Sequence, residues 1–454
     1  MSEDTRSTPA SVPVPPARRR LGRNYWRLLS ASTAANLGDG LMTVAVVWLA
    51  SSLTREASLI ALVALATRLP WLLFALPAGV ITDRIDRRLL VAWADAARFA
   101  VVAAFGAALL LHQDGLPTPA ELAAGAPPPG NAGWLLAALC GVALLLGSAE
   151  VLRDNAAQTL LPSVVDKRDL EKANSRMWGA ETATNNFIGP PLGGLLVAAA
   201  LALPFFLNAG LLAVSALLVF TLAGSFAPAA GARTGRISWR AEIAEGMRWL
   251  WRHRLLRTLA LLLAAMNALG AMAMVVLVLF VQDVLNLYQG WQFGLVTTGF
   301  AVGAVAGSAI ADRVAARLTP GTAMLTSIAG TGAALCVLST ISSAVLFWAT
   351  GVVSGFLMIL WNVVSVSLRQ RLIPDRLLGR GNSVYRFFGW GTLSLGAALG
   401  GVLVTAGEPW LGREGALRMP FLLAGLAHLA LLAYALPRIN SARVAAAEAR
   451  AVEG

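Results

Sequence analysis

Several ionisable residues stand inside otherwise apolar stretches in the first half of the chain, among them Asp39, Glu150, Arg153, Asp154 and Glu181. The three central ones are spaced i, i+3 and i+4, so they share one face of a helix. A carboxyl group in apolar surroundings ionises less readily, and a nearby arginine reverses that effect. A carboxyl group whose surroundings alternate can therefore bind a proton in one state and release it in another. We expect Asp39 and Glu181 to be the leading proton carriers, Glu150 to be third, and Arg153 to be a counter-ion or anion contact.

All of these residues except Glu181 also have a purely structural interpretation. Asp39 can form a hydrogen bond between two helices, and Glu150, Arg153 and Asp154 can form a cluster that satisfies itself. Both interpretations remain open from the sequence, because ionisable residues within a membrane are functional hypotheses but also pair with one another.

The composition places these residues in a membrane protein. The chain is 57% hydrophobic and 13% charged, with a mean hydropathy of +0.68. Soluble domains are about 45–50% apolar and about 25% charged, so an ordinary cytosolic enzyme, a disordered scaffold and a secreted disulfide module are excluded. Cys140 and Cys336 lie in apolar runs, and the three histidines are far apart. We therefore expect no disulfide framework, no metal site and no cofactor.

Twelve apolar runs are long enough to cross about 30 Å of hydrocarbon. Their apolar character is continuous, whereas barrel strands would alternate every second residue. The predicted fold class is an all-α integral membrane protein with 12 transmembrane helices. The predicted spans are 28–51, 58–82, 89–111, 133–157, 177–200, 203–223, 255–282, 290–311, 321–342, 344–368, 384–406 and 417–437.

The distribution of basic residues predicts the topology. If the N-terminus is cytoplasmic, 30 of the 36 Lys and Arg residues fall in cytoplasmic segments and three in outside loops. By the positive-inside rule both termini are cytoplasmic, in a multi-pass protein of the plasma or inner membrane. The net charge of +12 then holds loops near anionic lipid, so we expect membrane lipid and no nucleic acid as a partner.

A long connector divides the predicted spans into six and six. A weak repeat, Gln158–Pro162 against Gln370–Pro374, falls at matching places in the two halves. Repeated six-span halves are typical of secondary transporters that work by alternating access. The predicted parts are a disordered cytoplasmic tail (1–25), an N-terminal bundle (26–224), a cytoplasmic linker with an amphipathic helix (225–254), a C-terminal bundle (255–437) and a cytoplasmic tail (438–454).

The segment after the second predicted span, residues 79–88, reads GVITDRIDRR. It resembles the signature loop of the major facilitator superfamily, G-x-x-x-D-(R/K)-x-G-R-(K/R), and departs from it at Asp86, where the family has Gly. A degenerate second copy follows the eighth span. The resemblance covers the whole chain and implies the major facilitator fold, two six-helix bundles, with this loop locking one conformation. Simple anchorage of the loop by its last two arginines remains open. The residues assigned to conformational gating are Gly79, Asp83, Arg84, Arg87, Arg88, Asp312 and Arg313.

The fifth predicted span contains the run Gly189–Gly194, of sequence GPPLGG. It resembles the distal half of a motif of drug–proton antiporters, although Asn185 and Arg176 stand where that motif has its proximal glycines. Prolines and small residues allow a kink and close helix packing, which is also the structural alternative. The loops near 161–175 and 245–250 resemble the branch of siderophore exporters and macrolide efflux proteins. The helix-kink residues are Gly189, Pro190, Gly193 and Gly194.

The resemblance also implies a central cavity, lined most directly by spans 1, 4, 7 and 10. We expect Asp95 and Arg98 to form a structural pair near the end of a peripheral span. Arg68 has no assigned role, and snorkelling and a contact with Asp39 are both open. The candidate cavity residues are Asn36, Arg153, Asp154, Asn185, Asn267, Trp361, Asn362, Tyr385 and Arg386.

Together these features predict a proton-coupled exporter of an amphipathic small molecule, such as a drug, siderophore or secondary metabolite, functional as a monomer. An importer or lipid-class transporter on the same fold is the alternative. A polytopic enzyme or receptor is disfavoured, because the chain has no HExxH, GxSxG or phosphate-cradling segment and no long connector for a sensor domain. The expected partners are the substrate, protons and lipid.

Overall fold

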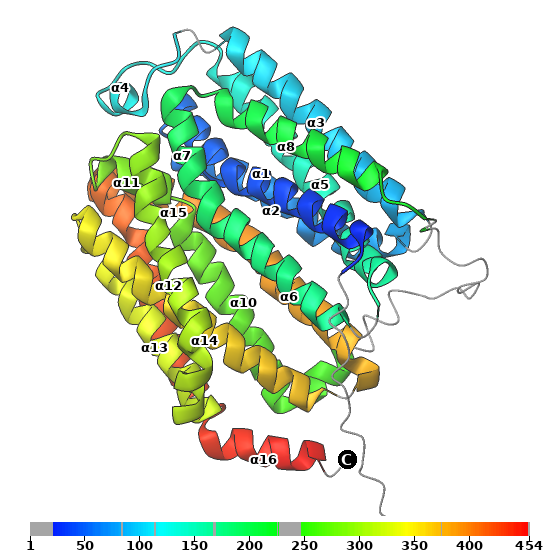
Figure 1. Cartoon of the computed structure of the whole chain (residues 1–454). Coiled ribbons are helices and arrows are strands. Elements are labelled where there is room, and N and C mark those ends of the chain that lie inside the picture. Colours follow the sequence, from blue (N-terminus) through cyan, green and yellow to red (C-terminus); the bar gives the residue numbers. More distant parts are fainter. Residues whose placement is uncertain are drawn as a thin grey trace, which may run out of the picture.

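The computed structural model describes residues 21–82, 85–112, 115–166, 169–224, 226, 247–373 and 375–452. Within these ranges the regular elements are helices and no strand occurs, which confirms the all-α class (Figure 1). Ten helical stretches are long and apolar enough to cross a membrane. The count is lower than twelve for two reasons. The fifth predicted span is divided among three shorter elements, and the last two predicted spans fall in one stretch, Phe387–Ala435.

The first half consists of long helices that begin and end close to the predicted spans. Its seventh element, η2, is a single stretch of π-helix directly before the glycine–proline run. A π-helix accommodates an extra residue in the turn, and Pro190 lacks a backbone N–H to continue a regular ladder. The elements are α1 (Arg23–Leu53), α2 (Ala57–Thr82), α3 (Arg87–His112), α4 (Pro119–Ala123), α5 (Ala132–Val164), α6 (Leu170–Glu181), η2 (Thr182–Ile188), α7 (Gly189–Ala199) and α8 (Leu203–Phe220).

The second half ends in a helix where the sequence predicted only a tail. This helix packs against two helices of the second half through Val444, which is buried. The longest element contains Gly412 at φ 69°, so it comprises two helices joined at a turn. The elements are α10 (Arg254–Met274), α11 (Leu277–Asp283), α12 (Gly290–Arg317), α13 (Pro320–Leu338), α14 (Ala344–Leu372), α15 (Asp375–Ala435) and α16 (Ser441–Val452).

The hydrophobic core is shared between the halves at one end of the bundle and divided at the other. We call the two ends the α4 end and the α16 end (Figure 1). The α1–α2 connection and Arg413, next to Gly412, lie at the α4 end, because both contact α11, which packs on α4. One large core joins both halves, with Trp48 of α1 close to Phe293 of α12. Two smaller cores toward the α16 end each belong to a single half, one around Tyr25 and the other around Trp361. The halves therefore separate toward the α16 end.

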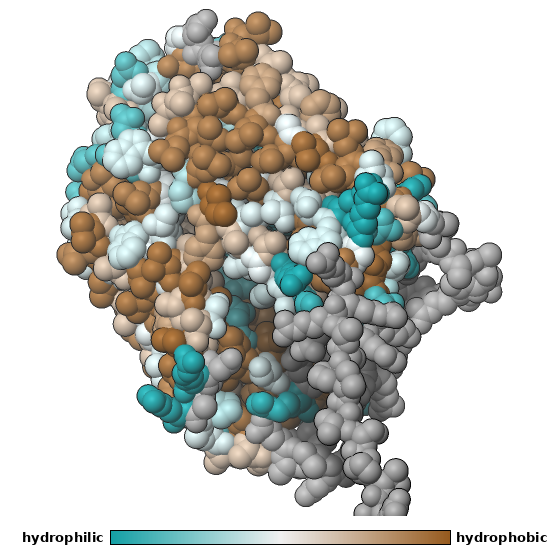
Figure 2. Space-filling model, viewed as in Figure 1, coloured by the Kyte–Doolittle hydropathy of each residue, from teal (hydrophilic) through white to brown (hydrophobic). Residues whose placement is uncertain are grey.

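Two helix pairs hold the halves together. Helix α2 packs on α15, and α7 packs on α12. At the second contact the backbones meet directly, because a Cβ added to Gly194 would lie 2.5 Å from the carbonyl oxygen of Gly290. Figure 2 shows hydrophobic residues over much of the visible helical face and a hollow between the halves with hydrophilic residues at its depth. The apolar face suits lipid, and the hollow is the natural place for a polar site.

Candidate functional site

A buried ionic cluster lies inside the first half, where α1, α3 and α5 meet. Arg98 of α3 is 1% exposed and forms an ion pair with Asp39 of α1. Asp95, one turn before Arg98, is fully buried, with its Oδ1 3.6 Å from Arg98 Nη1 and 3.4 Å from Arg153 Nε of α5. The i, i+3 spacing of Asp95 and Arg98 and the convergence of three helices thus bring two carboxylates and two guanidinium groups together.

Hydrogen bonds support part of this cluster, whereas Asp95 Oδ1, Arg98 Nη1 and Arg153 Nε meet opposite charges without a hydrogen bond to any described residue. The hydroxyl of Ser215 on α8 donates to Asp95 Oδ2 at 2.6 Å. Arg153 donates from Nη1 to Asp154 at 3.0 Å and from Nη2 to Ser32 at 3.4 Å. Asp95 is therefore held from two other helices, α5 and α8, and Arg153 links the buried cluster to the more accessible Asp154, which is 31% exposed. Buried charges of this kind are tolerated because they are paired and hydrogen-bonded.

The predicted proton carriers occupy two different environments. Asp39 belongs to the paired cluster, whereas Glu150 and Glu181 form no hydrogen bond or ion pair with any residue that the structure describes. Glu150 is within electrostatic range of Asp39 and Arg98. Glu181 is exposed at the junction of α6 and η2 and interacts electrostatically with Asp154, Arg153 and Asp39. Counting these three with Asp95 and Asp154, five carboxyl groups face three guanidinium groups, those of Arg98, Arg153 and, through Glu150, Arg68.

Two residues of this cluster were placed elsewhere by the sequence analysis. Asp95 and Arg98 were expected to pair near the end of a peripheral span, and they do interact. Their stronger partners, however, are Asp39 and Arg153 on other helices. The signal in the sequence was the opposite-charge pair at i, i+3 in an apolar helix, but only tertiary packing brings in α1 and α5. Ser215 carried no signal of its own.

Among the first-half cavity candidates, the Asn36 amide donates within its own helix to the Ser32 carbonyl at 2.8 Å. Asn185 lies in η2 and is partly buried. The glycines after it pack against α1: a Cβ on Gly189 would lie 2.5 Å from the Cα of Gly40. A Cβ on Gly193 would lie 2.6 Å from the Leu41 carbonyl oxygen. This is the close approach that small residues permit.

The second-half candidates are mostly occupied by internal hydrogen bonds. Asn267 donates to the carbonyl of Gly389 at 2.8 Å, and Tyr385 donates to the carbonyl of Leu256 at 2.6 Å, so both connect α10 with α15. Asn362 donates to a carbonyl of its own helix. Trp361 is 3% exposed, and its indole N–H has no acceptor among the described residues. The side chain of Arg386 lies outside the described residues.

The gating loop is described in part. The described residues do not include Asp83 and Arg84. They also exclude the side chain of Asp312 and the surroundings of Gly79. Arg313 is exposed. Asp86 Oδ1 accepts hydrogen bonds from the backbone N–H groups of Arg88 and Leu89, so it caps α3. This accounts for an Asp where the superfamily pattern has Gly.

The two arginines at the end of that loop form specific contacts. Arg87 Nη1 donates to the Thr159 carbonyl at 3.4 Å, and Arg88 Nη1 donates to the Leu222 carbonyl at 2.8 Å. They therefore tie the start of α3 to α5 and to the end of α8. Orphan carbonyls near helix ends are satisfied in this way.

A second ionic network, unforeseen from the sequence, joins the halves at the α4 end. Arg55, in the α1–α2 connection, pairs with Asp283 of α11. Arg413 Nε of α15 lies 2.9 Å from Asp283, and its Nη2 donates to the Arg55 carbonyl at 2.8 Å. Gln282 hydrogen-bonds Ser51 at 2.9 Å. The network closes the α4 end over the shared core.

Neutralising the centre of this network should loosen the closure. With Asp283→Asn, Arg55 and Arg413 lose their shared counter-charge. Each 1.4 kcal/mol of stabilisation lost from the closed state raises the equilibrium constant for opening of the α4 end about ten-fold. We expect a membrane-impermeant maleimide to label a cysteine at Ser58 roughly ten-fold faster, in a background with Cys140 and Cys336 replaced by Ser. Ser58 is the reporter because its N–H bonds Thr405 of the other half.

The matched control for that experiment is Glu414→Gln. Glu414 pairs with Arg418 within α15, near the same end, and does not join the halves. Its substitution should leave the labelling rate unchanged. An equal rate in Asp283→Asn and the wild type would show that the ionic network does not hold the halves together.

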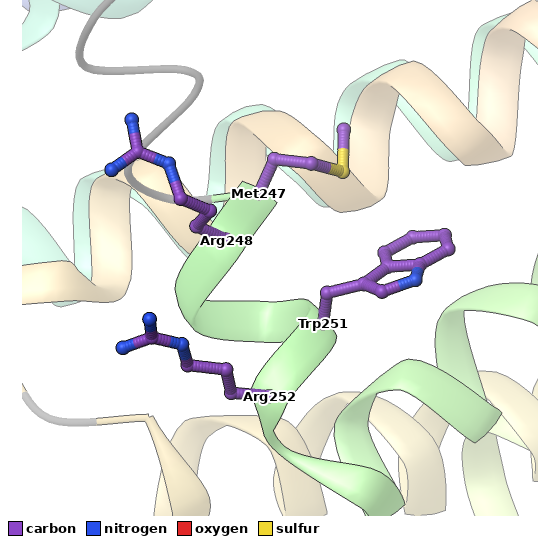
Figure 3. A pocket seen from close by; sticks show the side chains of 4 residues that line it. All are labelled: Met247, Arg248, Trp251 and Arg252. Atoms are coloured by element: carbon purple, nitrogen blue, oxygen red, sulfur yellow. The ribbon is translucent and has the colours of Figure 1, made fainter.

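A pocket of about 450 Å³ lies at the start of the second half, away from the ionic cluster. Its lining residues lie on two successive helical turns just before α10 and are Met247, Arg248, Trp251 and Arg252. Figure 3 shows Met247 and Trp251 projecting on one side of the chain and Arg248 and Arg252 on the other. This is the end of the predicted amphipathic linker helix, whose earlier part lies outside the described residues. An apolar face beside an arginine face suits a membrane surface.

Comparison with known proteins decides the family. Residues 12–452 match the family model described as transmembrane secretion effector, of the major facilitator superfamily. The chain belongs to this family. Its membership confirms the predicted superfamily and a multi-pass location in the cell membrane, and it makes the protein a transporter of small molecules. The number of spans and the side of the termini stay predictions.

Relatives of this chain include proteins named as multidrug efflux pumps. The "Multidrug efflux pump Tap" of Mycobacterium tuberculosis is 31% identical over 310 residues, which covers 66% of this chain and 68% of the pump. The protein of that name from Mycolicibacterium fortuitum is 28% identical over 429 residues, covering 91% and 95%. The resemblance thus extends over nearly the whole chain.

Solved transporter structures share the fold. A bacterial homologue of the iron transporter ferroportin in its inward-facing state has a TM-score of 0.65 at 20% identity, covering 91% of this chain and all of that one. The outward-facing state of that homologue has a TM-score of 0.57. At this identity the likeness concerns the fold alone. In the part of this chain that the structure describes, no group of three or more His, Cys, Asp and Glu residues is arranged to hold a metal ion.

Proposed function

We propose that the protein exports amphipathic small molecules in exchange for protons, by alternating access of a site between its two halves. The observation that carries the proposal is the surplus of five carboxyl groups over three guanidinium groups around the cluster of the first half. Carboxyl groups crowded in a poorly solvated site favour binding of a proton by one of them. The naming of two relatives as multidrug efflux pumps supports export over import.

The proposed topology has twelve crossings with both termini in the cytoplasm. The segment α6–η2–α7 supplies the fifth crossing, and the two parts of α15 on either side of Gly412 supply the last two. The α16 end is then cytoplasmic, in agreement with the distribution of basic residues. Because the cores divide toward that end, the hollow opens inward. The higher TM-score with an inward-facing structure agrees with this assignment.

In the proposed cycle, substrate enters the hollow from the cytoplasm while the α4 end stays closed. Rearrangement of the halves then closes the α16 end and opens the α4 end, where the substrate leaves and protons enter. Glu181, which is exposed and unpaired, is the first carboxyl group to exchange a proton. Glu150 and Asp154 connect it electrostatically to Asp39 and its partner Arg98. Proton binding thereby changes which ion pairs the cluster can form.

Reconstituted protein tests this proposal directly. In liposomes carrying rhodamine 123, an inward- or outward-directed proton gradient is imposed, and dye movement is followed by fluorescence with and without a protonophore. We expect movement opposite to the proton gradient, abolished by the protonophore. Dye movement in the same direction as protons would favour the importer alternative. Movement indifferent to the gradient would remove proton coupling from the proposal.

A further inference from the structure

Arg68 of α2 lies at the edge of the ionic cluster of the first half, where it interacts electrostatically with Glu150, and its surroundings point to a ligand. Arg68 lies eleven residues into α2, about 17 Å along the helix axis at 1.5 Å per residue. This is near the middle of a hydrocarbon layer about 30 Å thick. Arg68 is exposed and forms no hydrogen bond or ion pair with any described residue. An arginine at this depth faces a bundle interior or a water-filled cavity, because exposure to lipid there is costly.

The side chain of Arg68 lies over an aromatic surface shared by both halves. Its guanidinium carbon is 5.7 Å from the centroid of the Trp390 ring on α15. Trp390 is stacked on Trp71 of α2, with ring centroids 5.3 Å apart and an angle of 20° between the planes. Trp390 is 40% exposed, and Phe387, one turn earlier on α15, is 47% exposed. Flat ring surface therefore remains accessible beside the unpaired cation.

The seam that carries these rings is the α2–α15 contact, one of the two helix pairs that hold the halves together. Gly391, next to Trp390, packs against Leu72, next to Trp71, so closely that an added Cβ would lie 2.7 Å from Leu72 Cδ1. A ligand resting on the rings would consequently touch both halves at once. Its binding would depend on their relative position, as the transport cycle requires.

We propose that Arg68, Trp71 and Trp390 form a substrate site for a planar aromatic molecule that carries a negative charge, such as a carboxylate or phenolate. A guanidinium group pairs bidentately with such an oxyanion and stacks on aromatic faces, whereas it repels a cation. Indole rings supply the surface for the conjugated ring system. This inference rests on the proposed function, because it names the substrate class of the same hollow.

Two dyes of one shape and opposite charge test the site. Fluorescein methyl ester and rhodamine 123 share the xanthene ring and the methyl benzoate group, but the first is an anion and the second a cation. Their dissociation constants are measured by fluorescence anisotropy with the full-length protein in nanodiscs, with protein-free nanodiscs as the blank. We expect the wild type to bind the anionic dye more tightly.

Substitutions then separate charge from stacking. Arg68→Gln should weaken binding of fluorescein methyl ester about ten-fold or more, since a hydrogen bond between charged partners accounts for that much affinity, and should not weaken rhodamine 123. Arg68→Lys should retain part of the preference for the anionic dye. Trp390→Leu should weaken binding of both dyes. Arg438→Gln, at an exposed arginine of the second half, is the matched control and should change neither.

The proposal is overturned if Arg68→Gln weakens binding of both dyes equally, or if it weakens binding of neither dye. It is also overturned if the wild type does not bind the anionic dye. Gradient-driven transport of rhodamine 123, measured in parallel, separates this outcome from failure of the proposed function. If that transport persists without a charge preference that depends on Arg68, only the site is wrong. If the wild type transports neither dye against a gradient, proton-coupled export itself fails.

Discussion

Replacing Glu181 with Gln should lower gradient-driven efflux about ten-fold or more, within the roughly 5–150-fold range typical of coupling between two sites. The substitution keeps the size of the side chain and removes its ability to bind and release a proton. Glu181 has no partner among the described residues, so its loss should not disturb the fold. The measurement is the initial rate of protonophore-sensitive dye efflux from cells without other pumps, at matched expression.

The control for this substitution is Glu414→Gln, which neutralises an exposed carboxylate of α15 paired only within its own helix. It should leave efflux unchanged. Asp39→Asn is expected to lower efflux as well, but it also deprives the buried Arg98 of its partner, so its effect on folding must be measured beside transport. Normal proton-driven efflux by Glu181→Gln would assign the coupling proton to another carboxyl group.

Replacing Arg153 with Met should destabilise the first half by about 3–5 kcal/mol, the cost of leaving a buried charge without its partner. Arg153 is 4% exposed and contacts both Asp95 and Asp154. Asp95 is fully buried, so after the substitution it would depend on Arg98 and Ser215 alone. The measurement is the free energy of unfolding of the purified protein in mixed micelles, from the loss of helical circular dichroism.

A second substitution gives the cause of that loss. Adding Asp95→Asn to Arg153→Met removes the uncompensated carboxylate, so we expect the double variant to regain part of the lost stability. Arg438→Met removes an exposed arginine just after α15 whose side chain contacts Tyr434 in the last turn of that helix, and it should change stability by less than about 0.5 kcal/mol. Equal stability of Arg153→Met and the wild type would mean that the cluster does not stabilise the fold.

Hydropathy predicted the helices well, because a lipid-facing helix must be apolar along its whole length. The first predicted span, 28–51, lies within α1, and the fourth, 133–157, lies within α5. Both helices extend past the predicted bounds, since a helix continues in water beyond the apolar part that hydropathy detects. The helix α16 was missed, because it packs on the end of the bundle and does not cross an apolar layer.

Local backbone irregularity was predicted less completely. The glycines and prolines after Asn185 indicated a kink in the fifth span, but the π-helical stretch itself depends on how η2 packs against α1. The turn at Gly412 lies between two predicted spans, so the sequence separated the two helices of α15 correctly, but it did not place the turn at this residue. In both places tertiary packing decides the backbone path, and local propensity does not.

The charged residues of the site were found individually, but their partners were not. An ionisable residue in an apolar run is visible in any sequence, which is why Asp39, Glu150 and Glu181 were selected. Which guanidinium group meets which carboxylate depends on the rotation of each helix about its axis. The pairing of Asp39 with Arg98 on α3 therefore emerged only from the structure.

The crossing of Gly194 and Gly290 is one of the contacts by which the resting transporter excludes leakage of small ions. A barrier made of side chains becomes briefly permeable whenever a rotamer changes, on the nanosecond timescale of such motions. Here the barrier is backbone against backbone, because a Cβ added to either glycine would lie within 3 Å of the opposite carbonyl oxygen. Such a barrier yields only when whole helices are displaced, which is slow. A cell can thus keep many copies of this protein without dissipating its membrane potential.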